Sequence, residues 1–124
     1  MAHYMSDYSY SHYQSNGDPV RKTQYELKSN ILVALAHPNR IRILEFLQDG
    51  VKCNCEIAPA LDLEQSNLSR HMKILVQEGI VISWKDGLRV NYKVADERIF
   101  DILSLAGKVS HSEAKIRVEL FEEV

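Results

Sequence analysis

Residues 65–94 combine an amphipathic helix with a β-hairpin, and this combination constrains the fold more than any other stretch. Apolar residues recur at the helical spacing i, i+4, i+7, i+8, at Leu68, Met72, Leu75 and Val76. Gly79 is suited to end that helix. Two β-branched segments then flank Asp86-Gly87, a dipeptide typical of hairpin turns. We therefore predict a helix over residues 65–78 and an antiparallel hairpin over residues 80–94.

Apolar periodicity predicts helices on both sides of this unit. A helix within residues 20–36 carries a stripe at Leu27, Ile31, Leu32 and Leu35. The next helix begins near Pro38, where the missing proline N–H costs nothing in a first turn, and ends near Gly50. A long helix over residues 96–122 follows the hairpin.

A short helix ending near Leu61 precedes the polar-faced helix, separated from it by a tight turn within "DLEQS". Pro59 is tolerated only in a first turn, so this short helix is predicted to begin between Asn54 and Ile57. The order helix, helix, short helix, turn, polar-faced helix, hairpin, helix predicts an α+β fold, mostly α. It describes a winged helix-turn-helix with extra N- and C-terminal helices.

The chain of 124 residues has the size of one domain. Residues 1–19 are rich in Ser and Tyr, contain no Leu, Ile or Val, and are predicted to be a flexible tail. Residues 20–124 are predicted to be the folded domain. The chain has no apolar run of about 18 residues and no signal-peptide pattern, so we expect a cytoplasmic protein. It also lacks a Gly-rich phosphate loop and a nucleophile elbow, so we expect neither an enzyme nor an organic cofactor.

Basic residues concentrate in the helix–hairpin unit although the whole chain has a formal net charge of −2. Residues 65–93 contain five basic and two acidic residues, a net charge of +3, which fits a surface for a polyanion. A helix fits the major groove of double-stranded DNA when its exposed face carries hydrogen-bonding side chains. The alternative is a solvated helix face beside a soluble hairpin.

The side chains predicted to contact DNA lie on this helix and on the hairpin. Gln65, Ser66 and Asn67 lie at the helix N-terminus, where backbone N–H groups favour a phosphate. Arg70 is able to bind guanine with two hydrogen bonds. The remaining candidates suit backbone phosphates or the neighbouring minor groove, and they are Ser69, Lys73, Lys85 and Arg89.

Cys53 and Cys55 are the only cysteines, and both lie at the predicted N-terminal edge of the short helix. Thiolates are soft ligands suited to arsenite, Cd, Pb or Zn. At an extended helix start the two side chains lie on one side and share an ion. Two alternatives stay open: simple packing, and a thiol redox switch. Because a disulfide across Cys-x-Cys is strained, we expect the redox switch to need either a bond between subunits or oxidation of the thiols.

Three segments together resemble the ArsR/SmtB family of metal-responsive repressors: "ALAHPNRIRILEFL", "CNCEIAPALDLEQSNLSRHMKILVQEGIV" and "GLRVNYKV". The resemblance extends over residues 27–105. It implies a homodimeric repressor on an inverted-repeat operator, released by an inducing ion at Cys53 and Cys55. It also implies DNA contacts at recognition-helix and wing positions, which here are Gln65, Ser66, Ser69, Arg70, His71, Arg89 and Tyr92. For His71, near the edge of the apolar stripe, a hydrogen-bonded structural role is the alternative.

The chain departs from the family pattern around the thiol pair. Ala58 stands where arsenic sensors of one branch have a further cysteine, and the N-terminal tail has no cysteine that would complete a cadmium or lead site. The third ligand is left open among water, chloride, Glu56, and His3 or His12 of either subunit. The family's other ion site, on the C-terminal helix, is predicted to be absent, because Asp96 is followed by non-ligands at Arg98, Val109 and Ser112.

The apolar stripes at residues 27–35 and 99–106 exceed what a small core needs, so we predict that they form a homodimer interface. A two-fold dimer offers two recognition helices about 34 Å apart, matching successive major grooves. The alternative is that the stripes complete the monomer core. Two other functions stay open: a winged-helix regulator with a redox switch or no ligand, and a winged-helix protein-interaction module.

Overall fold

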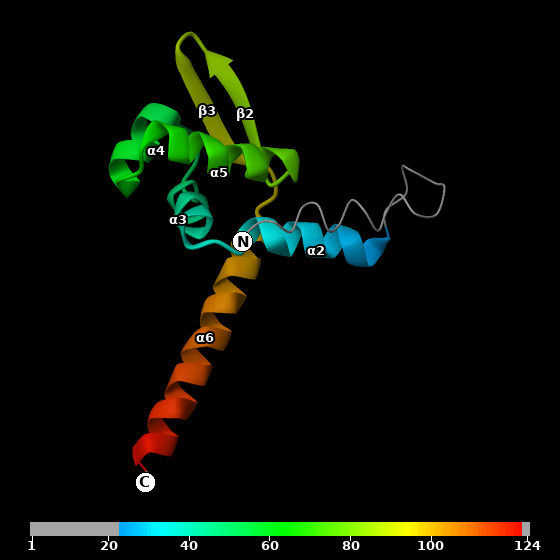
Figure 1. Cartoon of the computed structure of the whole chain (residues 1–124), viewed down its shortest axis with the longest axis vertical. Helices are drawn as coiled ribbons and strands as arrows, with labels where there is room; N and C mark the ends of the chain where they lie inside the picture. Colours follow the sequence, from blue (N-terminus) through cyan, green and yellow to red (C-terminus); the bar gives the residue numbers. More distant parts are fainter. Residues whose placement is uncertain (1–22, 123–124) are drawn as a thin grey trace.

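The computed structural model describes residues 23–122, which form five helices and a three-stranded sheet (Figure 1). The elements follow one another as α2 (Gln24–Leu35), α3 (Pro38–Phe46), β1 (Lys52–Cys53), α4 (Asn54–Leu61), α5 (Gln65–Gln77), β2 (Val81–Asp86), β3 (Arg89–Val94) and α6 (Arg98–Glu122). The predicted α+β winged helix-turn-helix, mostly helical, is confirmed. The predicted tail, residues 1–19, lies outside the described residues.

Helix α5 is held by its apolar face, as its periodicity predicts. Leu68, Met72 and Leu75 are at most 1% exposed and pack in the core with residues of α3, α4 and the sheet. Burial of side chains this size stabilises the fold by about 1.5–3 kcal/mol each. Gly79 ends the helix with φ of +73°, a conformation that favours glycine. The opposite face of α5 is therefore presented to solvent in a fixed orientation.

The predicted hairpin is formed by β2 and β3, which pair in antiparallel register from Val81 with Val94 to Asp86 with Arg89. Gly87 has φ of +63°, which a two-residue hairpin turn requires. The wing, defined here as β2, β3 and their connecting turn, projects beyond α5 in Figure 1.

The strand β1 is missing from the sequence prediction. It pairs antiparallel with β3, Lys52 opposite Tyr92 and Cys53 opposite Asn91, so the sheet order is β1-β3-β2. Two residues are too few to show an alternating pattern. The strand exists because of its partner in the wing, which no local signal around Cys53 reveals.

Helix α4 begins at Asn54, within the predicted range, but the placement of Pro59 is not as expected. Pro59 is the sixth of the eight helical residues rather than a member of the first turn. A proline at this position cannot donate to the carbonyl four residues earlier, which belongs to Cys55. Helix α4 ends only two residues later, so the missing hydrogen bond affects only the turn that carries Cys55.

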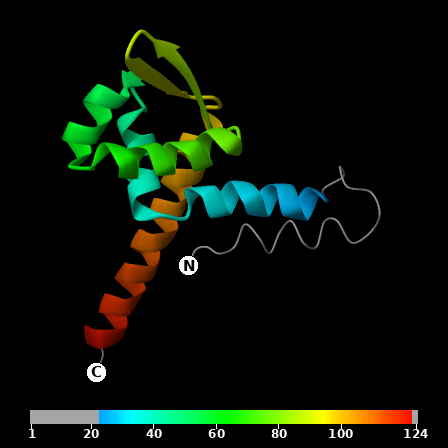
Figure 2. The ribbon, with the colours of Figure 1, turned by 45° about the horizontal axis from the view of Figure 1, so that its top comes forward.

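The two apolar stripes predicted for dimerisation divide between core and surface. Leu35 and Ile99 are buried in the core, as the alternative interpretation requires. Leu27 and Leu105 remain 53% and 60% exposed. Figures 1 and 2 show α6 leaving the rest of the domain as a long arm. Within residues 23–122, no helix combines the length and hydropathy needed to cross a membrane.

Candidate nucleic-acid interface and thiol pair

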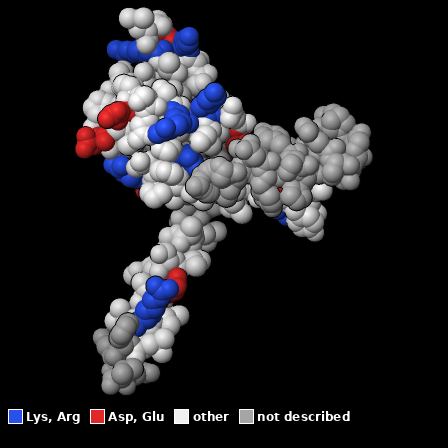
Figure 3. Space-filling view, viewed as in Figure 1, with Lys and Arg blue, Asp and Glu red and all other residues white. Residues whose placement is uncertain are grey.

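Most of the predicted DNA-contact residues share one exposed region formed by α5 and the wing. Asn67 is half-buried, and the others are exposed: Gln65, Ser66, Ser69, Arg70, Lys73, Lys85 and Arg89. Figure 3 shows Lys and Arg gathered over α5 and at the wing tip. The exposed face of α5 thus combines hydrogen-bonding side chains with positive charge, as recognition of a DNA groove requires.

Within α5, Arg70 is oriented by a neighbour one turn earlier. Its Nη2 donates to Oδ1 of Asn67 at 2.6 Å. This hydrogen bond fixes a long, exposed side chain that would otherwise lose more conformational entropy on binding. The guanidinium keeps further N–H donors with which to contact a base or phosphate.

The structure corrects the prediction for His71 and Tyr92, which lie in the core instead of on the DNA-facing surface. His71 is 6% exposed and Tyr92 is 7% exposed. His71 continues the apolar side of α5, next to Met72, so its ring points inward. Tyr92 lies on the middle strand of the sheet, between Lys52 of β1 and Ser83 of β2. Burial raises the pKa of the Tyr92 phenol.

His71 belongs to a polar cluster behind α5. Nη1 of Arg40 lies 3.3 Å from its Nδ1, and the His37 ring packs against it at a tilt of 54° with centroids 4.4 Å apart. Burial is the main reason that the pKa of His71 falls to about 4, with smaller contributions from His37, Arg40 and Arg70. The imidazole is therefore neutral at pH 7 and accepts a hydrogen bond from Arg40. The structural role that was the alternative for His71 is the one observed.

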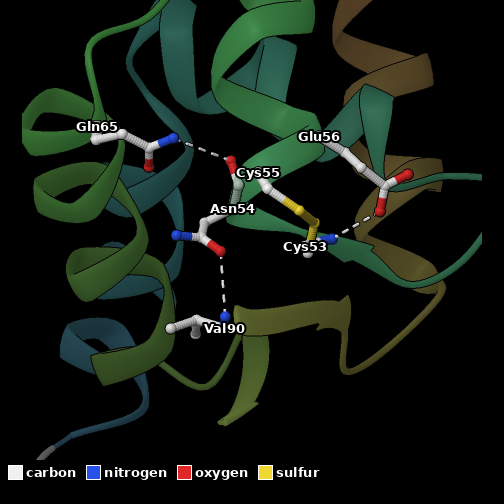
Figure 4. Close-up of a disulfide and its surroundings, with 6 residues drawn as sticks. All are labelled: Cys53, Asn54, Cys55, Glu56, Gln65 and Val90. Carbon is white, nitrogen blue, oxygen red and sulfur yellow. Dashed lines mark hydrogen bonds between the residues drawn. A yellow bond between two sulfur atoms is a disulfide. The ribbon is translucent and has the colours of Figure 1, made fainter. Parts of the chain in front are cut away.

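The two cysteines are joined by a disulfide in the structure (Figure 4). Cys53 is 2% exposed, whereas the neighbouring Cys55 is exposed. The bond lies within one chain, whereas the sequence favoured a bond between subunits or thiol oxidation over a disulfide within Cys-x-Cys. Cys53 precedes α4 in an extended conformation, so the two Cα atoms are 5.2 Å apart, within the usual range for disulfides. The sulfur atoms therefore lie on one side, as predicted for a helix start.

Asn54, between the cysteines, is hydrogen-bonded to both elements that carry the predicted DNA contacts, α5 and the wing (Figure 4). Its side-chain Oδ1 accepts a hydrogen bond from the backbone N–H of Val90 in the wing, at 3.1 Å. Its backbone oxygen accepts one from Nε2 of Gln65, the first residue of α5, at 3.4 Å. Sequence reasoning missed this residue, because its partners are distant along the chain and one of them is a backbone group.

Once the disulfide is reduced, the two thiolates suit a thiophilic ion in donor type but are too few to complete its coordination. Glu56, the nearest predicted third ligand, accepts a hydrogen bond from the Cys53 backbone N–H through Oε1 at 3.0 Å. In the part of the chain from residue 23 to 122, no three His, Cys, Asp or Glu side chains are grouped to hold a metal ion. His3 and His12 lie outside the described residues. A third donor therefore has to be solvent, an anion, a reoriented Glu56 or a group from outside this range.

Asp96, the residue that matches the family's other ion site, is hydrogen-bonded to Arg98, the first residue of α6. Its carboxylate accepts hydrogen bonds from the backbone N–H and the guanidinium of Arg98, between 2.6 and 3.2 Å. These bonds lower the pKa of Asp96 to about 2. The prediction that this second site is absent stays a prediction.

Comparison with known proteins agrees with the geometry of the helix–wing unit. The family model described as "Bacterial regulatory protein, arsR family" matches residues 37–83. The HTH-type transcriptional regulator Rv0081 of Mycobacterium tuberculosis is 36% identical over 101 residues, covering 81% of this chain and 89% of the relative. This chain belongs to the ArsR/SmtB family. It is a transcriptional regulator and not an enzyme, as predicted.

One further relative and two solved structures are also similar to this chain. The arsenical resistance operon repressor of Staphylococcus xylosus is 36% identical over 73 residues, covering 59% of this chain and 70% of the relative. The crystal structure of M. tuberculosis Rv0081 superposes with a TM-score of 0.69 at 35% identity, covering 79% of this chain and 99% of that one. A homodimeric winged helix-turn-helix domain from Mycobacterium bovis, at 22% identity and a TM-score of 0.65, supports the fold alone; the match covers 77% of this chain and 94% of that one.

Proposed function

We propose that this ArsR/SmtB protein is a cytoplasmic, homodimeric repressor that leaves an inverted-repeat operator when Cys53 and Cys55 bind a thiophilic ion. Arsenite and the soft divalent ions Cd, Pb and Zn are the candidate inducers. The exposed residues of α5 and the wing are the proposed DNA contacts, with Arg70 reading a base and the remaining polar side chains holding phosphates.

The observation that carries the proposal is the location of the sulfur atoms. They lie together at the start of α4, immediately before the helix-turn-helix, and one of the two cysteines is exposed. Because α4 and the recognition helix are joined by a turn of three residues, a change at the α4 start is transmitted to α5 over a short path. A ligand that prefers the altered arrangement weakens DNA binding by a coupling of about 1–3 kcal/mol.

Dimerisation is supported by apolar side chains left uncovered on α2 and α6. Beyond Leu27 and Leu105, the exposed large apolar residues of these helices are Tyr25, Leu32, Val109, Ile116, Val118 and Leu120. Apolar surface of this extent on two long helices is typical of a protein–protein interface. A second copy related by a two-fold axis is the occupant that also gives two recognition helices for an inverted repeat.

The disulfide favours a second candidate, release by oxidation. In this reaction the two thiols and hydrogen peroxide give one S–S bond and two molecules of water, so two electrons pass from sulfur to the peroxide. The product is the bond that joins Cys53 and Cys55 in the structure. Both candidates use the same pair and the same path to α5, and they differ only in what reacts with sulfur.

The test is DNA release by the reduced dimer under argon. A duplex selected from a random library by the reduced protein is the probe, and arsenite, cadmium, zinc and peroxide are added in parallel. We expect Cys53→Ser/Cys55→Ser to keep full DNA affinity and to lose the response. Each single serine variant also loses the response, because chelation and disulfide formation both need two sulfurs. Release of the double variant by the same reagent would refute the thiol site, whereas failure to select any duplex would refute DNA recognition.

A further inference from the structure

The side chain of Asn54 continues the pairing between β1 and β3 beyond the end of β1. Lys52 is opposite Tyr92 and Cys53 is opposite Asn91, so the next pair in this register is Asn54 with Val90. At this position the main chain turns into α4 and cannot supply the expected carbonyl. Oδ1 of Asn54 takes its place and accepts the Val90 N–H at 3.1 Å (Figure 4).

The main-chain oxygen of Asn54, which the turn into α4 directs away from the strand, has a partner in the recognition helix. It accepts the hydrogen bond from Gln65, at the N-terminus of α5. Val90, in turn, follows Arg89 of the wing tip and pairs with Lys85 across the hairpin. One residue therefore bridges the two elements that carry the proposed DNA contacts.

The conformation of Asn54 depends on whether the sulfur atoms of Cys53 and Cys55 are bonded to each other, free, or bound to an ion. A bond between Cys53 and Cys55 closes a small ring that contains the Asn54 backbone, and this ring restricts the dihedral angles of Asn54. Two free thiols remove that restriction, and two thiolates around an ion impose a different sulfur separation. The first turn of α4 is less constrained against such changes, because Pro59 has no N–H to donate to the Cys55 carbonyl.

We propose that Asn54 is the positioning residue that transmits the state of the Cys53–Cys55 pair to the wing and to α5. This inference rests on the proposed function, because it takes DNA affinity to depend on the state of the thiols. When the state of the pair changes, Asn54 rotates, the Val90 N–H loses or regains its acceptor, and the start of β3 shifts relative to α5. DNA affinity changes because the wing and α5 no longer fit the same duplex together.

The test measures the thiol response, defined as the ratio of DNA dissociation constants in two states of one protein. The states are the dithiol and the disulfide made with diamide, which takes up the two hydrogen atoms released as the S–S bond forms. A second ratio compares the dithiol with and without arsenite. We expect a response of about 5–150-fold in the unmodified protein, the usual range for coupled sites.

Asn54→Ala is the variant that separates transmission from sensing. It removes the acceptor for Val90 and leaves both cysteines, so both thiols still titrate and arsenite still binds. Its thiol response falls to less than about 3-fold, below the range of coupled sites. Asn54→Asp keeps an acceptor oxygen and restores the response. Asn39→Ala is the matched control, because it removes an asparagine side chain on α3 that accepts a hydrogen bond from Arg42, away from the thiols and the wing.

The outcomes distinguish this inference from the function on which it rests. A purely structural Asn54 would weaken DNA binding equally in both states, and the unchanged ratio in Asn54→Ala would overturn the inference while leaving the thiol sensor intact. A ratio of one in the unmodified protein would overturn the proposed function. If Asn54→Ala does not fold, the Val90 amide of the unmodified protein decides: its NMR shift and hydrogen exchange must change between states, and identical values would overturn the inference.

Discussion

Nη1 of Arg40 lies 3.3 Å from Nδ1 of His71, so a guanidinium on α3 contacts a buried imidazole of the recognition helix. The same guanidinium donates from Nε to the Ala34 carbonyl at 2.5 Å and from Nη2 to the Val33 carbonyl at 3.4 Å. These two carbonyls belong to the last turn of α2, where the usual donor four residues on is missing, and the Val33 carbonyl also accepts from the backbone N–H of Ala36 at 3.1 Å. One side chain thus joins α2, α3 and α5 behind the DNA-facing surface.

Arg40→Ala is predicted to lower the free energy of unfolding by about 2–4 kcal/mol, since hydrogen bonds from a charged donor contribute about 1.5–3 kcal/mol each and are not additive. Arg40→Lys recovers less than half of the loss, because one ammonium group cannot reproduce the guanidinium fork. Urea unfolding followed by circular dichroism at a fixed protein concentration measures both. A loss below 0.5 kcal/mol for Arg40→Ala, about the size of a surface effect, would contradict the bridging role.

The low pKa of His71 predicts acid sensitivity. The pKa is about 4 in the folded protein, mainly through burial, and about 6.5 in an unfolded chain. At pH values between 4 and 6.5, the His71 imidazole binds a proton in the unfolded state but not in the folded state. Stability is therefore complete only well above pH 6.5, decreases by at most about 3 kcal/mol as the pH falls toward 4, at about 1.4 kcal/mol per unit of pKa difference, and levels off below that. Unfolding curves from pH 4 to 7.5 measure the slope.

His71→Gln is the variant that assigns this slope. It keeps a side chain able to accept from Arg40 but removes the titrating ring. We expect most of the pH dependence to disappear, with the remainder due to His37, whose pKa is also lowered, mainly by burial. If His71→Gln has the same slope as the unmodified protein, the acid sensitivity comes from other groups.

The helix–wing unit was predictable because its signals are local. The apolar spacing of Leu68, Met72 and Leu75 and the glycine at residue 79 fix α5, and Gly87 fixes the hairpin turn between Asp86 and Arg89. His71 was ambiguous, since a residue at the edge of an apolar stripe faces inward only if a partner such as Arg40 is there. That partner is 31 positions away, and helical periodicity carries no information about it.

The location of the thiol site was predictable from the sequence, but its hydrogen bonds to the wing were not. The resemblance to the family located the cysteine pair, and the start of α4 at Asn54 explains why both sulfurs lie on one side. The strand β1 and the Asn54–Val90 hydrogen bond depend on how the wing folds back onto this segment. Such long-range pairing leaves no pattern in a two-residue strand.

Arg70→Ala is predicted to weaken binding to the selected duplex by about 1–3 kcal/mol and to relax the preference at one base position. The reason is the loss of a guanidinium that Asn67 holds in place on the exposed face of α5. Fluorescence anisotropy with the selected duplex and its single-base variants measures both effects. Arg117→Ala removes the same charge from the far part of α6 and serves as the control, with an unchanged dissociation constant. Equal losses in the two variants would mean that only net charge matters.

Leu105→Glu is predicted to dissociate the dimer, because it introduces a charge into the apolar surface that α6 leaves exposed. The dimer dissociation constant increases by at least about tenfold, which corresponds to 1.4 kcal/mol. Sedimentation equilibrium measures the change. Ser104→Glu, one residue earlier on α6 and also exposed, is the control that adds the same charge. A dimer that withstands Leu105→Glu would place the interface on another surface.

Reciprocity gives the most direct test that the thiol pair and the DNA-facing surface are coupled. If binding of an ion at Cys53 and Cys55 weakens DNA binding by a given factor, DNA must weaken ion binding by the same factor. Calorimetric titration of arsenite into the reduced dimer, free and bound to the selected duplex, measures this factor independently of any release assay. We predict an arsenite dissociation constant about 5–150-fold higher in the DNA complex. Equal dissociation constants for the free and DNA-bound protein would contradict the account.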